Sequence, residues 1–193
     1  MKVVPLLEKF HGKRLLLDTN LLLPYFMGSY YQAHQQVSRH GSFKEEEFQL
    51  LAQIVEYFRK VGNILTTPHI LTEVSNLGLK KPKGFKCPHC GKEINAGLSL
   101  RLKENRVAFM KFIRPWIRQL DEEFDEKRIG ACRLSGREYF PRFGLADAAI
   151  IELAYDHRLL ILTDDEDLAD HLKNQKRGQN VVYFGELKRT ILD

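Results

Sequence analysis

The strongest constraint on the fold comes from two short apolar segments that each end in an acid. Residues 14–17 read Arg-Leu-Leu-Leu and precede Asp18, while residues 159–163 read Leu-Leu-Ile-Leu-Thr and precede Asp164 and Asp165. Apolar residues that follow one another without alternation are typical of a strand that is buried on both faces of a parallel sheet. The two segments therefore predict two strands of such a sheet.

Segments with other patterns lie between and beyond these two strands. Shorter strands are predicted at residues 63–67 and 181–184. Strands that alternate with helices indicate an α/β fold, with a doubly wound, mostly parallel central sheet flanked by helices. The expected helices span residues 20–27 (bent at Pro24), 43–61, 68–77, 98–120, 146–157 and 167–175, and a short helix ends the chain.

Length and composition are those of a single folded domain. The 193 residues are 44% hydrophobic and 28% charged, and residues 78–142 resemble a largely helical insertion into that domain. Because no segment resembles a membrane span, a signal peptide or a secreted disulfide framework, we expect a cytoplasmic location without a membrane partner. The net charge of +5 favours a polyanionic partner such as nucleic acid, although a merely basic surface has the same charge.

Acidic residues follow several of the predicted strands. Asp18 ends the first strand, Asp164 and Asp165 follow the strand at residues 159–163, and Glu73 lies one turn into the helix after residues 63–67. The carboxyl ends of parallel strands meet at one edge of the sheet, so we expect these acids to converge there. Asp147 opens the helix that precedes residues 159–163 and is expected at the same edge.

Converging carboxylates repel one another unless a cation lies between them. Hard divalent cations such as Mg²⁺ and Mn²⁺ prefer oxygen ligands and can promote hydrolysis at a phosphoryl group. Each acid also has a simpler interpretation, because Asp caps helices and Glu is favoured in a first helical turn.

Four segments carry a resemblance to a known family. They are Leu15–Asn20 (Leu-Leu-Leu-Asp-Thr-Asn), Thr67–Val74, Leu145–Ile151 and Ile161–Asp165 (Ile-Leu-Thr-Asp-Asp). In sequence and order they are similar to the successive motifs of PIN-domain nucleases. The resemblance covers the two ends of the chain and leaves the middle uncovered.

The resemblance implies a parallel sheet with an acidic pocket, Mg²⁺ or Mn²⁺ as cofactor, and an endonuclease activity on RNA. Many small members of the family are toxins that pair with an antitoxin, so a protein partner of that kind is also implied. The acids implied to be catalytic and metal-binding are Asp18, Glu73, Asp147 and Asp165.

The family motif around the fourth acid is Thr-x-Asp. It selects Asp165 over Asp164, with Asp164 as the alternative because acids occupy the whole run that follows Thr163. By the same resemblance, Asn20 and Thr163 occupy polar positions that shape the pocket for substrate.

Two features of the middle region suggest binding sites of their own. Cys87-Pro-His-Cys90 is similar to one zinc knuckle, and a closed zinc site needs two further ligands. Cys132 is one candidate, and the other is a histidine such as His34 or His40, or a ligand from a second chain in a homodimer. Reduced, inert thiols are the alternative interpretation.

The long helix predicted in the same region alternates basic and aromatic residues. Arg106 and Arg114 can bind phosphates while Phe109, Phe112 and Trp116 stack on bases, which would make the helix an RNA platform. The alternative is an amphipathic helix with its aromatic residues in the core.

Three other functions fit an acidic pocket in an α/β fold. A haloacid-dehalogenase-like phosphatase needs Asp-x-Asp after the first strand, and here Asn20 stands at the second position. A phospho-receiver domain carries its acid pair after the first strand and not after a late one. A catalytically silent module that binds RNA or a protein partner would keep the acids without the activity.

Overall fold

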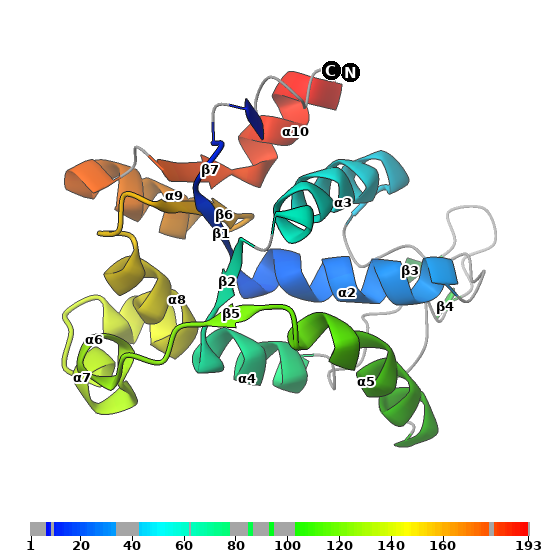
Figure 1. Ribbon diagram of the computed structural model, residues 1–193, viewed down its shortest axis with the longest axis horizontal. Coiled ribbons are helices and arrows are strands. Elements are labelled where there is room, and N and C mark those ends of the chain that lie inside the picture. The colour runs from blue at the N-terminus through cyan, green and yellow to red at the C-terminus, as the bar shows by residue number, and fades with distance from the viewer. Residues whose placement is uncertain are drawn as a thin grey trace.

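The computed structural model of the protein is shown in Figure 1. It describes residues 7–8, 10–33, 43–61, 63–77, 85–86, 93–94, 103–177 and 180–192.

A five-stranded sheet forms the centre of the fold, and every strand in it runs parallel to its neighbours. Helices lie on either side of the strands (Figure 1), so the prediction of an α/β fold with a parallel sheet is confirmed. A separate antiparallel pair joins β3 (Phe85–Lys86) to β4 (Glu93–Ile94). The strands of the central sheet, in spatial order, are β5 (Asp121–Glu122), β2 (Ile64–Thr66), β1 (Arg14–Leu17), β6 (Leu159–Thr163) and β7 (Val181–Tyr183).

Helices occupy most of the remaining described chain. They are α2 (Thr19–Ala33), α3 (Glu45–Lys60), α4 (Pro68–Leu77), α5 (Lys103–Ile117), α6 (Glu126–Ile129), α7 (Ala131–Ser135), α8 (Phe140–Leu153), α9 (Glu166–Leu172), the π-helical turn η1 (Lys173–Arg177) and α10 (Phe184–Leu192). None of the described helices is long and apolar enough to cross a membrane.

The two central strands are buried as their apolar sequences predict. Leu15 and Leu16 of β1 are fully buried, and Leu16 lies opposite Ile161 of β6 in the parallel register. All five residues of β6 are buried, including Thr163. A strand with both faces covered needs no polar alternation, which is why these segments contain so few polar residues.

Helix α2 is longer than expected and continues through Pro24. The prediction of a helix at residues 20–27, bent at Pro24, was too short, because α2 continues to Ala33. Pro24 cannot donate the usual hydrogen bond one turn back, and packing of the helix against the core offsets that loss. Gly28 is part of this packing, since a Cβ atom there would collide with the ring of Phe48 on α3.

The region predicted as a helical insertion contributes to the central sheet. Strand β5 pairs with β2 and forms one edge of the sheet, and α5 packs against α2. Strand β5 was not predicted, because its two exposed acidic residues carry no apolar pattern. Helix α5 begins at Lys103, and residues 98–102 of the predicted helix lie outside the described chain.

The order of the strands determines where a site can form. The chain proceeds from β1 outward through β2 to β5, then returns to β6 beside β1 and ends at β7. The direction of this progression reverses between β1 and β6. In open parallel sheets, ligands bind outside the carboxyl ends of the strands at such a reversal.

Candidate active site

Asp18 and Thr163 lie side by side at the carboxyl ends of β1 and β6. The Thr163 hydroxyl donates a hydrogen bond of 2.8 Å to Oδ2 of Asp18, and it accepts one of 2.9 Å from the backbone N–H of Asp165. Asp18 is only 1% exposed and Thr163 is fully buried. Thr163 therefore fixes the orientation of Asp18 and the entry into α9.

Asn20 also faces the Asp18 carboxyl group. Its backbone N–H and its side-chain amide each lie 3.4 Å from an oxygen of Asp18. Burial nevertheless raises the pKa of Asp18, and the charges of Asp165 and Glu73 add to this effect; the result is about 6, although the hydrogen bonds from Thr163 and Asn20 lower it. Asp18 is therefore costly to ionise in the metal-free protein.

Glu73 is held beside Asp18 by the first residue of α2. Its Oε2 atom accepts a hydrogen bond of 2.9 Å from the Thr19 hydroxyl. Helix α4, which carries Glu73, begins at Pro68 with the Thr67 hydroxyl accepting from the N–H of Ile70 at 3.2 Å. This is the predicted start of the helix, and it places Glu73 in the second turn.

Asp147 reaches the cluster because α8 is broken at Gly144. Gly144 has φ 76° and ψ −171°, a conformation that is essentially restricted to glycine, and the helix restarts after it. Asp147 thus lies in the first turn of the second segment. Burial raises the pKa of Asp147 to about 8, with further contributions from the charges of Asp18, Asp165 and Glu73.

The two adjacent aspartates after β6 lie in different surroundings. Asp165 accepts a hydrogen bond of 3.0 Å from the N–H of Leu168 and so caps α9, while its charge acts on both Asp18 and Asp147. Asp164 lies 3.5 Å from the ammonium group of Lys188 on α10. The structure therefore groups Asp165 with the other acids and pairs Asp164 with a cation.

The donor set suits a hard divalent cation, because all four acids offer oxygen and none pairs with a described Lys, Arg or His. The four are close enough for their charges to raise the pKa values of Asp18 and Asp147. Among the described residues, however, no three acidic, histidine or cysteine side chains converge tightly enough to hold an ion. The chemistry of the site fits a metal, and the present side-chain positions do not complete its coordination.

Three residues of the site were not assigned a role from the sequence. Thr19 is the middle residue of the Asp-Thr-Asn segment, but its side chain is not acidic. Gly144 directly precedes the Leu-Ala-Asp segment. The glycine three residues before Asp147 was a signal for a break in the helix. Lys188 lies on the last helix and no local pattern connects it with Asp164.

The predicted zinc site lies mostly outside the described chain. Cys87, Cys90, His34 and His40 belong to residues that the structure does not describe. Cys132 is a free and exposed thiol on α7. Zinc binding therefore stays a prediction.

The aromatic residues of α5 face inward. Phe109 is 3% exposed, and the Trp116 ring packs 4.9 Å from that of Tyr25 and 5.7 Å from that of Phe26, measured between centroids. These rings pack against the core, which favours the amphipathic interpretation of α5 over a stacking platform for bases. Arg106 and Arg114, the predicted phosphate ligands, are exposed on the opposite side of the helix.

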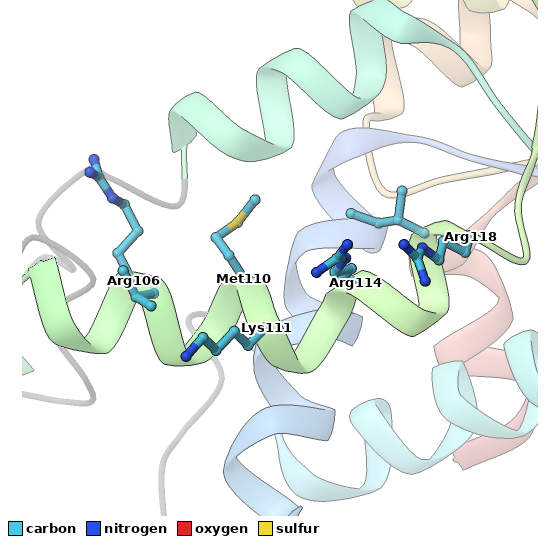
Figure 2. Close-up of a pocket in the computed structure, with 7 residues that line it drawn as sticks. Arg106, Met110, Lys111, Arg114 and Arg118 are labelled. Carbon is cyan, nitrogen blue, oxygen red and sulfur yellow. The ribbon is translucent and has the colours of Figure 1, made fainter.

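A groove with a volume of about 400 Å³ lies on that opposite side, and we call it the α5 groove. Figure 2 shows Met110 between Arg106 and Arg114 along its length. The described residues that line the α5 groove are Arg106, Val107, Met110, Lys111, Arg114, Ile117 and Arg118.

Comparison of the chain with protein-family models, with curated proteins and with solved structures gave no match.

Proposed function

We propose that this protein is a metal-dependent endoribonuclease of the PIN-domain type, which hydrolyses RNA phosphodiester bonds at a cluster of four carboxylates. One observation carries the proposal. A fully buried carboxylate, Asp18, lies at the reversal point of a parallel sheet, and three further acids surround it without a described cationic partner. Such an arrangement is unfavourable for stability, so we infer that it is retained for a function that requires it.

The residues that would hold Mg²⁺ or Mn²⁺ are Asp18, Glu73, Asp147 and Asp165. When bound, the cation would activate water and neutralise charge on the phosphoryl group. The hydroxyls of Thr163 and Thr19 each donate to one acid of the cluster and fix its orientation. Partners of this kind are worth about 10- to 100-fold in metal affinity or activity in other metal sites.

Asp147 carries the proton of the cluster in the metal-free protein. Its pKa, raised to about 8, keeps the group largely protonated at neutral pH. Cation binding requires the carboxylate form, so we expect one proton to leave Asp147 when the cation enters. The cluster therefore avoids holding four unbalanced negative charges before the cation arrives.

A matched pair of amide substitutions tests the proposal. Cleavage of a labelled single-stranded RNA by purified protein should require Mg²⁺ or Mn²⁺ and should stop on addition of EDTA. Asp18→Asn should lower the rate by about 100-fold or more, because a ligand matters at least as much as its outer partners. Asp164→Asn is the control, since its carboxyl group pairs with Lys188 and not with the other acids.

Two outcomes would contradict the proposal. Cleavage by Asp18→Asn at the wild-type rate would remove the carboxylate cluster from the reaction. RNA binding without cleavage in the presence of either cation would favour the catalytically silent module.

A further inference from the structure

The α5 groove is a cationic and apolar surface that the carboxylate cluster does not use. Val107 and Met110 are 42% and 41% exposed, although both are apolar. The four cations of the groove form no ion pair with any described residue. Exposed apolar side chains rimmed by charge mark sites where another molecule binds.

A surface of the opposite charge follows α5 along the chain. Residues 121–126 read Asp-Glu-Glu-Phe-Asp-Glu, and we call them the acidic loop. Phe124, in the middle of this loop, is 71% exposed, which is the largest value among the exposed large hydrophobic residues that the structure describes. An aromatic side chain in this position contributes nothing to the core.

Part of the acidic loop is already engaged within the chain. Asp121 pairs with Arg14 at 3.1 Å, and Asp125 caps α6 by accepting from the N–H of Lys127. Glu122 and Glu126 are exposed and form no ion pair with any described residue. Two carboxylates therefore flank Phe124 and are available to a partner.

We propose that the α5 groove of one chain binds the acidic loop of a second copy of this chain. Phe124 inserts among the apolar side chains of the groove, and the loop carboxylates face its cations. Aromatic residues and arginine are enriched at protein interfaces, and the two surfaces are opposite in charge. In a two-fold dimer the same pair of contacts forms twice, and this requires each chain to carry both surfaces, as this chain does.

Other occupants are less well matched to the groove. RNA phosphates would pair with the cations of the groove, but the rings of Phe109 and Trp116, on which bases would stack, face inward against α2. Residues 78–102, which precede α5, hold six Lys and Arg residues and one Glu, so their charge does not complement the groove. The acidic loop of a second copy offers charge opposite to that of the groove, and Phe124 can pack on the exposed apolar side chains of the groove.

Two charge-reversed variants test the pairing. The groove variant carries Arg106→Glu and Arg114→Glu, and the loop variant carries Glu122→Lys and Glu126→Lys. All four positions are exposed, so both variants should fold. By sedimentation velocity the wild-type protein should have twice the mass of one chain, and each variant alone should have the mass of one chain.

An equal mixture of the two variants should restore the dimer. In the mixed dimer the reversed groove meets the reversed loop, and the unchanged groove meets the unchanged loop, so both contacts join opposite charges. Phe124→Ser should weaken the wild-type dimer by about tenfold or more, as expected for an aromatic anchor at an interface. Val61→Ser is the control, because Val61 is 50% exposed and lies outside both surfaces. Added salt should weaken the dimer.

Several results would overturn this proposal. A wild-type protein that stays monomeric up to about 1 mM would do so, since that limit leaves less than about 4 kcal/mol of association free energy. A dimer that either variant retains, or a mixture that stays monomeric, would do so too. Loss of RNA binding by a groove variant that is still dimeric would assign the groove to nucleic acid instead. The Asp18→Asn variant should still form the dimer. Failure of the dimer proposal and failure of the proposed nuclease activity are therefore separate results.

Discussion

Replacing Asp147 by Asn should stabilise the metal-free protein. The pKa of Asp147 is raised from 3.8 to about 8 in the folded state, mainly by burial. The folded protein therefore holds a proton more tightly than the unfolded chain, and the unfolding free energy falls as the pH rises from about 4 to about 8. Asn is neutral and of nearly equal volume, so the variant should lose this dependence on pH.

The size of the effect follows from the displacement of the pKa. Each pH unit between the two pKa values corresponds to roughly 1.4 kcal/mol, so at pH 7 the displaced pKa would lower the free energy of unfolding by roughly 4 kcal/mol if water did not reach the group. Asp147 is partly exposed, so water reduces this cost, and its ionisation is coupled to that of the neighbouring acids. We therefore expect Asp147→Asn to raise the free energy of unfolding by about 1–3 kcal/mol at pH 7. In a chain of 193 residues this corresponds to an increase in Tm of about 2–4 °C for each kcal/mol.

Urea unfolding in EDTA between pH 4 and pH 8 measures this effect. The variant should exceed the wild type at pH 7 and approach it at pH 4, where the aspartic acid is also neutral. Asp170→Asn, at an exposed position of α9, is the control and should change little at any pH. Saturating Mn²⁺ should stabilise the wild type and should stabilise the Asp147→Asn variant much less. A variant that is no more stable than the wild type at pH 7, or a gain that does not depend on pH, would refute the reasoning.

The remaining predictions concern the fourth acid, the break in α8 and the cysteines. Asp165→Asn should lower the rate of RNA cleavage by orders of magnitude, about as much as loss of another ligand. Asp164→Asn should lower that rate far less, because Asp164 pairs with Lys188. The reverse order in the cleavage assay would assign the fourth acid to Asp164. Gly144→Ala should cost about 1–3 kcal/mol in urea unfolding because φ is 76° there, and it should slow cleavage by displacing Asp147, while Gly136→Ala, at φ −85°, should do neither. Cys90→Ser should lower thermal stability while Mn²⁺ still binds, provided that elemental analysis finds zinc in the purified protein; zinc far below one equivalent per chain, or per pair of chains, would exclude the zinc site.

The central part of the fold could be predicted because its sequence is unambiguous. Strands β1 and β6 each contain consecutive apolar residues, and these residues are buried on both faces of the sheet. Their carboxyl ends share one edge of the sheet, so the proximity of Asp18 to Thr163 and Asp165 follows from the order of elements alone. Strand β5 could not be predicted in this way, because its exposed Asp121 and Glu122 are held by pairing to β2 and not by burial.

Other features depend on contacts that no local pattern contains. Proline inside a helix usually ends or bends it, and the continuation of α2 past Pro24 depends on packing against α3 and α5. The choice between Asp164 and Asp165 depends on Lys188, which arrives from the last helix. The inward orientation of the α5 rings depends on Tyr25 and Phe26 of α2.

The central claim is that four carboxylates converge on a divalent cation, and crystallography with Mn²⁺ tests it most directly. Anomalous scattering from crystals grown with Mn²⁺ locates the ion without reference to the side chains. We expect the ion between the carboxyl ends of β1 and β6, with an oxygen of Asp18 and oxygens of at least two of Glu73, Asp147 and Asp165 within about 2.5 Å. An ion bound elsewhere, or no ion at the cluster when Mn²⁺ is saturating, would contradict the account.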